Sequence, residues 1–227
     1  YSCVGDDEIG HYVTQSFTDE GVSTEYVTTY PNAKTDLSAI IVMTQNGERT
    51  IFHNRDANER LVVEEERLMR AEWFFVSALN GDWKKNLETV VAAHKKSGAR
   101  LALNPGQHNI REDAAVILAA LSEVAVLLLN KDEAIELVMK SAVSATPDQL
   151  NDEEFLLQTL HSFGAKTIGM TDGKRGAWGS DGQSVWSCPI ATRGAVLDST
   201  GCGDAFGSGF MAAHLAGKTL PQALQYG

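Results

Sequence analysis

The sequence predicts an α/β protein with a mostly parallel central sheet. From residue 64 onward, short apolar runs alternate with segments that have the periodicity of amphipathic helices. The apolar runs are continuous, which is typical of strands buried on both faces of a parallel sheet. Polar residues or glycines follow several of these runs, at the strand ends where such sheets bind ligands.

The elements of this part follow one another in strand–helix order. Asn104-Pro105-Gly106 and Thr171-Asp172-Gly173 interrupt the pattern after two of the strands, as proline and glycine usually do. We expect strands at 73–76, 101–103, 124–129 and 167–170, and helices at 83–96, 111–121, 131–140 and 147–163. A short strand at 177–179 and a helical pattern at 220–227 complete the chain.

The first 60 residues have a different organisation. A strand at 1–4 leads into a helix from Ile9 to about Glu20, which Gly21 ends. Strand-like segments follow at 26–30, 37–44 and 50–53. The last two are joined by Gln45-Asn46-Gly47-Glu48, and Asn-Gly is a strong hairpin signal. No helical pattern interrupts the three segments, so we expect them to form an antiparallel patch apart from the main sheet.

Composition excludes several classes of function. The formal net charge of −11 argues against nucleic acid or an anionic membrane as a partner. No apolar run reaches the roughly 18 residues that a membrane span needs. The cysteines at 3, 188 and 202 form no CxxC pair and lack paired histidines, which argues against a zinc site or a disulfide framework. This cysteine usage fits a reducing, cytoplasmic location.

The most informative run is Asp-Ser-Thr-Gly-Cys-Gly-Asp-Ala-Phe-Gly-Ser-Gly at residues 198–209. Gly201 and Gly203 precede Asp204 at the expected start of a helix, where free N–H groups and the helix dipole attract anions. An anion site beside a proton acceptor is what phosphoryl transfer to a hydroxyl requires. Alternatively, the glycines serve turns and packing, and Asp204 only complements the dipole. A reactive thiol at Cys202 is a weaker hypothesis, because no histidine stands beside it.

Two other motifs have both a ligand-binding and a structural interpretation. Asn130 and Glu133 fall on one helix face after a buried strand, where they could hold Mg²⁺ through waters or form an ordinary capping box. The turn Thr171-Asp172-Gly173-Lys174-Arg175-Gly176 could contact nucleotide phosphates or simply join two strands of a hairpin.

Two familiar nucleotide-binding motifs are incomplete. Gly217-Lys218-Thr219 ends like a P-loop, but Ala212 stands where the first glycine is needed. No complete G-x-G-x-x-G occurs, since Phe206 occupies the third glycine position after Gly201 and Gly203. A dinucleotide-dependent dehydrogenase therefore has little support.

In combination, these residues resemble the signatures of the PfkB/ribokinase family of sugar and nucleoside kinases. The run 198–206 is similar to the family's C-terminal signature, with Cys202 in place of the more usual alanine. The weaker motifs occur in the family's order, namely Val4-Gly5-Asp6-Asp7-x-x-Gly10, Asn104-Pro105-Gly106, Asn130-x-x-Glu133 and Thr171-x-Gly173-x-x-Gly176.

The resemblance implies a ribokinase-like three-layer α/β/α sandwich with a small β lid. The core would comprise residues 1–25 and 59–227, and the lid segment residues 26–58. Gly201, Cys202 and Gly203 would form the anion hole, and Asp204 would be the base. The resemblance assigns the other roles as follows: Asn130 and Glu133 to Mg²⁺, Thr171, Gly173 and Gly176 to the nucleotide, Gly5, Asp6, Asn58 and Asn104 to the substrate, and Asp198 and Thr200 to a possible K⁺.

We therefore expect ATP-dependent, Mg²⁺-assisted phosphoryl transfer to a small sugar. A nucleoside kinase of the same family and a non-catalytic sugar- or nucleotide-binding relative remain alternatives. Relatives of this fold commonly pair through their lids, which makes a homodimer a further hypothesis. The chain opens inside a strand pattern and ends inside a helical one, so we expect a fragment that lacks the family's substrate-binding start and its final nucleotide-binding stretch. The activity of the fragment itself is left open.

Overall fold

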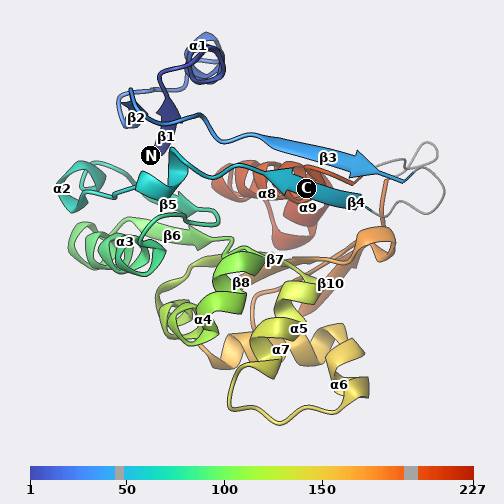
Figure 1. Ribbon diagram of the computed structural model, residues 1–227. Coiled ribbons are helices and arrows are strands. Elements are labelled where there is room, and N and C mark those ends of the chain that lie inside the picture. The colour runs from blue at the N-terminus through green and yellow to red at the C-terminus, as the bar shows by residue number, and fades with distance from the viewer. Residues whose placement is uncertain (44–48, 192–198) are drawn as a thin grey trace. The chain divides into compact units, whose positions relative to one another are not determined.

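The computed structural model describes residues 1–43, 49–191 and 199–227, which form two compact units (Figure 1). One unit comprises Tyr1–Glu65 with Asn80–Val90, and the other comprises Glu66–Leu79 with Val91–Gly227. The predicted division into a core and a lid segment at 26–58 stays a prediction. The predicted turn at 45–48 lies outside the described residues.

The N-terminal unit contains two separate two-stranded sheets. Strands β1 (Ser2–Gly5) and β2 (Val27–Tyr30) pair in parallel, with helix α1 (Glu8–Asp19) between them in sequence. Strands β3 (Ser38–Val42) and β4 (Arg49–His53) form an antiparallel ribbon.

The expectation of one antiparallel patch was therefore wrong for residues 26–30. The crossover through α1 brings β2 alongside β1 in the same direction, as helical connections between strands usually do. Only the two strands expected at 37–44 and 50–53 pair antiparallel.

The second unit is built on a six-stranded sheet with the order β10-β9-β8-β7-β6-β5. Strands β5 to β8 are parallel to one another, and β9 and β10 are antiparallel additions at one edge. The strands are β5 (Trp73–Val76), β6 (Arg100–Leu103), β7 (Val126–Asn130), β8 (Thr167–Thr171), β9 (Ala177–Ser180) and β10 (Val185–Cys188). The mostly parallel sheet predicted from the continuous apolar runs is confirmed.

The helices follow the predicted order with two exceptions, of which the first is the short helix at Glu65–Leu68, which was not predicted. Residues 147–163 form two helices because Asp152 leaves the helical conformation and caps the second one through the N–H groups of Glu154 and Phe155. The helices are α2 (Glu65–Leu68), α3 (Trp83–Ser97), α4 (Gln107–Ala120), α5 (Lys131–Met139), α6 (Pro147–Asn151), α7 (Glu153–Ser162), α8 (Cys202–Leu215) and α9 (Leu220–Tyr226), with 3₁₀ turns at Asn58–Arg60, Leu121–Glu123 and Gly173–Arg175.

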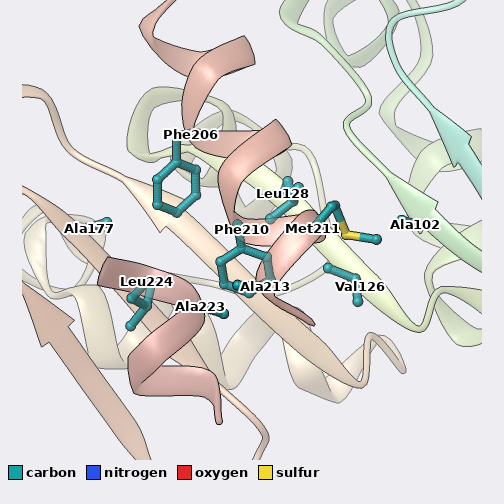
Figure 2. Close-up of a cluster of buried hydrophobic side chains, with 10 residues drawn as sticks. All are labelled: Ala102, Val126, Leu128, Ala177, Phe206, Phe210, Met211, Ala213, Ala223 and Leu224. Atoms are coloured by element: carbon teal, nitrogen blue, oxygen red, sulfur yellow. The ribbon is translucent and has the colours of Figure 1, made fainter. Parts of the chain in front are cut away.

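Helices cover both faces of the sheet. Figure 1 shows α8 and α9 on one side of it, and α4, α5 and α7 on the other. Figure 2 shows the first interface, a cluster in which Phe206, Phe210 and Met211 of α8 gather with Val126 and Leu128 of β7. Successive side chains of a strand point to opposite faces, so Leu127 faces the other helical layer. This burial on both faces explains the uninterrupted apolar run of β7.

The same packing fixes the direction of α8. Near its start, Phe206 lies beside Gly169, the middle residue of β8. Near its end, the ring of His214 lies 5.6 Å from that of Trp73, the first residue of β5. Helix α8 is therefore antiparallel to the parallel strands of the sheet, and its N-terminus lies toward their carboxyl ends.

In the part of the chain that the structure describes, no helix is long and apolar enough to cross a membrane. The three cysteines are free.

Candidate active site

The start of α8 presents backbone N–H groups that have no acceptor among the described residues. Gly201 precedes the helix in the left-handed conformation, with φ of 78°. The N–H of Cys202 donates to Ser199 O at 3.2 Å, and that of Ala205 to Gly201 O at 2.9 Å. Among the described residues, no group accepts from the N–H groups of Gly203 and Asp204 between them. These donors and the positive end of the helix dipole form a site suited to an anion.

Packing does not explain why residue 203 is a glycine. A Cβ atom at Gly203 would meet no described atom within 4 Å, and its backbone has no positive φ. By contrast, a Cβ atom at Gly209 on the same helix would collide with the carbonyl oxygen of Tyr226. An alanine would also favour the helix more than glycine does. The open space in front of Gly203 supports the interpretation that a ligand approaches the backbone there.

Asp204 occupies the first turn of α8 and is exposed. Its carbonyl oxygen accepts a hydrogen bond of 2.7 Å from Ser208 Oγ. Within the described ranges, no hydrogen bond or ion pair engages its carboxylate, which is free to accept a proton from a bound group. The role of this carboxylate as a base stays a prediction.

Asn130 and Glu133 form the capping box of α5. Asn130 Oδ1 accepts from the Glu133 N–H at 2.9 Å, and Glu133 Oε2 accepts from the Asn130 N–H at 2.9 Å. The structural interpretation of this motif is therefore confirmed, while its role in holding Mg²⁺ stays a prediction. The capping box engages one oxygen of each side chain, and the Gln107 N–H group is a further hydrogen-bond donor to the Glu133 carboxylate.

Glu133 is buried, with 7% of its surface exposed. Burial raises the pKa of its carboxyl above the ordinary value, against the lowering effect of the Asn130 and Gln107 N–H groups. No cluster of three His, Cys, Asp or Glu side chains suited to a metal occurs among the described residues. Mg²⁺ keeps most of its waters when it binds to a protein, so a few carboxylate and amide oxygens are enough to hold it. Metals that need a full set of protein ligands fit this site less well.

The turn after β8 is a hairpin into β9, as one of the two interpretations predicted. Thr171 ends β8 and lies directly opposite Asn130 in the parallel pairing of β7 with β8. Gly176 is required by packing, since a Cβ atom there would collide with the carbonyl oxygen of Cys188. A Cβ atom at Gly173 would meet nothing within 4 Å in the part of the chain that the structure describes. The contact of this turn with a nucleotide stays a prediction.

Asn104 belongs to the same edge of the sheet. It directly follows β6, and its N–H donates to Val76 O of β5 at 2.7 Å. The structure thus brings Asn104, Asn130 and Thr171 to the carboxyl ends of the parallel strands, as predicted, and the start of α8 lies toward the same edge. Asp198 lies outside the described residues, so the proposed K⁺ site with Thr200 stays untested.

The predicted substrate residues of the N-terminal unit have clear structural roles. A Cβ atom at Gly5 would collide with the carbonyl oxygen of Ala33. Asn58 Oδ1 accepts from the N–H of Cys3 at 3.3 Å. Asp6 is exposed, with one carboxylate oxygen 3.2 Å from His11 Nε2. Their contact with substrate stays a prediction.

Asp7 carries the main polar network of this unit, and the sequence analysis assigned it no role. Its carboxylate accepts from Gly10 N at 2.9 Å, Thr35 N at 2.9 Å and Thr35 Oγ1 at 2.6 Å. The Thr35 hydroxyl also accepts from Gly5 N at 2.9 Å. An aspartate directly before a helix is a usual capping signal, but its second partner, Thr35, is distant in sequence.

The hydrogen bonds from the Thr35 hydroxyl, the Thr35 N–H and the Gly10 N–H lower the pKa of Asp7 to about 2. Because this pKa is depressed, the resulting stability is present above the unfolded pKa of about 3.9 and is lost as pH falls through the folded pKa. We expect Asp7→Asn to lose less stability than wild type between about pH 4 and pH 2. Urea unfolding at several pH values measures this, with Asp6→Asn as control. Equal losses in wild type and Asp7→Asn would contradict the assignment.

The fold and the edge residues define a class of protein. A sheet covered by helices on both faces, with a glycine-rich helix start at its carboxyl edge, is the ribokinase-like α/β sandwich, and solved structures with that fold superimpose on nearly the whole chain. The chain belongs to the pfkB family of carbohydrate kinases, which it matches over residues 1–227. It is therefore a kinase domain of the sugar and nucleoside kinase family.

Individual relatives agree with this assignment at low identity. The ribokinase of Haemophilus influenzae is 26% identical over 233 residues, which cover 100% of this chain and 71% of the relative. A ribokinase II of E. coli, solved with ATP and Mg²⁺, has a TM-score of 0.79 at 21% identity and is covered over 72% of its length. A Burkholderia thailandensis nucleoside kinase, solved with inosine, has a TM-score of 0.78 at 19% identity, with 69% of its length covered.

Proposed function

We propose that the complete protein transfers the γ-phosphoryl group of ATP to a hydroxyl of a small sugar with the help of Mg²⁺. The observation that carries this proposal is the start of α8. Among the described residues, nothing engages the N–H groups of Gly203 and Asp204 or the Asp204 carboxylate, and nothing obstructs Gly203. Phosphoryl transfer needs such an arrangement, since its catalysis consists mostly of positioning and charge stabilisation.

In this proposal, the N–H groups of the α8 start stabilise the charge on the transferred phosphoryl group. Gly203 and Asp204 offer their N–H groups directly, while that of Cys202 is bonded to Ser199 O. Asp204 accepts the proton of the attacking hydroxyl, a contribution usually worth about 10²–10⁴-fold. Gly201 supplies the left-handed turn that starts the helix.

ATP and Mg²⁺ are proposed because a similar structure was solved with both. Asn130 and Glu133 would hold the hydrated Mg²⁺, which would neutralise phosphate charge, and Thr171 and Gly173 would line the nucleotide site. Glu133 suits this role because it places a carboxylate beside Asn130 at the end of β7, and Gly173 because no described atom would lie within 4 Å of a Cβ atom there. We also propose K⁺ near Asp198 and Thr200, and a cytoplasmic location supported by the free cysteines.

The acceptor is tested by an ADP-release assay on the complete protein over ribose, fructose, 2-keto-3-deoxygluconate and adenosine. We expect turnover with a sugar, as the similarity to a ribokinase suggests. Turnover with adenosine alone would favour a nucleoside kinase, the class of the neighbour solved with inosine. Sugar binding by calorimetry without any turnover would favour a non-catalytic relative.

A homodimer through the β3–β4 ribbon is the last part of the proposal. Ile41, Met43 and Phe52 are exposed by 60%, 49% and 60%, although large apolar side chains are usually buried. Pairing two copies through these strands would cover this apolar surface. Light scattering of the complete protein tests this, and a monomeric mass would contradict it.

A further inference from the structure

Four charged side chains form a network beside the predicted nucleotide turn. Lys131 Nζ lies 2.6 Å from Glu153 Oε1 and 3.5 Å from Asp172 Oδ2. The guanidinium of Arg175 lies 3.0 Å from Glu153 Oε1 and also pairs with Asp172. We call these residues the Lys131 network. It contains two cations and two carboxylates, so its charges balance.

The position of Lys131 is energetically unfavourable for a cation. It is the first residue of α5, where the helix dipole disfavours a cation, and only 6% of its side chain is exposed. Burying an ammonium group costs free energy unless it is paired and hydrogen-bonded. Glu153 and the carbonyl oxygen of Asn151, at 2.8 Å, satisfy it from the α6–α7 junction.

The network joins two strand ends that carry predicted ligand-binding residues. Asn130 and Thr171 lie opposite each other where β7 and β8 end. The next residue after each is a member of the network, Lys131 after Asn130 and Asp172 after Thr171. The ion pair between them therefore ties the start of α5 to the start of the nucleotide turn.

Asp172 and Arg175 also hold the turn together through the backbone. The N–H of Asp172 donates to Gly176 O at 2.8 Å, and the N–H of Arg175 donates to Asp172 O at 2.9 Å. Arg175 is engaged by two carboxylates, although it projects from the tip of the turn. Its place in the network indicates that it shapes the turn.

Glu153 belongs to neither strand end, yet it accepts from both cations of the network. Burial alone would raise the pKa of its carboxyl, but the Lys131 hydrogen bond and the charges of Lys131 and Arg175 hold it below the ordinary value. Glu153 therefore stays ionised and holds both cations in place from α7.

We propose that Lys131 and Glu153 are positioning residues that hold the turn 171–176 in the conformation that receives the nucleotide. The inference rests on the proposed function, because Thr171 and Gly173 were assigned to the nucleotide there. A turn that is already ordered binds its ligand without the cost of ordering it on binding. Loss of the network should weaken nucleotide binding and leave the chemical step nearly intact.

The test compares Glu153→Gln with Glu123→Gln in the complete protein. Glu123 is a matched control, since its carboxylate pairs with Lys95 at 2.9 Å and with His94 at 3.4 Å, but it precedes β7 at the opposite end of the sheet. We expect Glu153→Gln to raise the KM for ATP about tenfold with kcat within about threefold of wild type, and Glu123→Gln to change neither. Lys131→Met should act in the same direction and more strongly.

Trypsin provides a readout that does not depend on activity. Lys174 and Arg175 place two cleavage sites in the turn, and we expect cleavage there to be several-fold faster in Glu153→Gln than in either wild type or Glu123→Gln. Unchanged cleavage and an unchanged KM would overturn the proposal, as would an equal effect in Glu123→Gln. If the wild-type protein bound no ATP, the proposed function would fail, and the cleavage rates alone would decide whether the network holds the turn.

Discussion

The Asp204→Asn variant of the complete protein is expected to lose phosphoryl transfer by about 10²–10⁴-fold while it still binds ATP. Asparagine keeps the size and the exposed position of the side chain but cannot take a proton from the acceptor hydroxyl. The first turn of α8 and its open N–H groups would remain. Steady-state kinetics and an ATP titration on the same preparation measure both quantities.

Asp148→Asn is the matched control for this experiment. Asp148 is also an exposed aspartate in the first turn of a helix, α6, and it has no part in the proposed chemistry. We expect this variant to retain wild-type kcat. A near-normal rate in Asp204→Asn would remove Asp204 as the base, and an equal loss in both variants would point to a general effect of removing surface charge.

Gly203→Ala is expected to reduce kcat/KM by about 10²-fold, a loss similar to that caused by removing one oxyanion-hole donor. The added methyl group would occupy the space through which the phosphoryl group approaches the N–H groups. Since a Cβ atom there meets none of the described atoms within 4 Å, the fold should be undisturbed. The free energy of unfolding should even rise by about 0.5–1 kcal/mol, because alanine favours a helix over glycine.

Gly207→Ala separates this local effect from a general change in α8. A Cβ atom at Gly207 would make an ordinary contact with Leu128 Cδ1 at 3.6 Å, so we expect the activity of this variant to be unchanged. Urea unfolding and steady-state kinetics on both variants give the comparison. Full activity in Gly203→Ala would show that no ligand approaches the backbone at this position.

The sequence was sufficient to predict the sheet of the second unit. Continuous apolar runs such as 124–129 can be recognised as strands because burial on both faces leaves no polar position in the strand. Since no polar residue falls inside such a strand, the first polar residue after the apolar run marks the end of the strand. The residues placed correctly at one edge in this way are Asn104, Asn130 and Thr171. The β9–β10 pairing was missed, since a short edge strand with Ser187 and Cys188 has no clear period.

The N-terminal unit was harder to predict because its contacts join residues that are distant in sequence. The pairing of β2 with β1 depends on the crossover through α1, and the pattern of residues 26–30 is the same for a parallel or an antiparallel partner. The hydrogen bonds of Asp7 with Thr35 likewise span 28 residues. The pattern of residues along the sequence does not directly indicate contacts between residues that are far apart in it.

In the candidate site, the sequence indicated the residues but not what each of them touches. Asn130 and Glu133 had two interpretations, and only the structure shows that the capping box forms. Glycine counting could not separate Gly203, which faces open space, from Gly209, which packing requires. The Lys131 network could not be predicted from the sequence because its members come from three separate segments of the chain.

In the proposed function, the complete protein transfers a phosphoryl group to a sugar hydroxyl at the start of α8. A single-turnover reaction with γ-³²P-labelled ATP, Mg²⁺ and the preferred sugar of the complete protein tests it most directly. We predict that the label appears on the sugar with the wild-type protein and stays on ATP with Asp204→Asn over the same time. Label recovered only as inorganic phosphate, or equal transfer by both proteins, would contradict the claim.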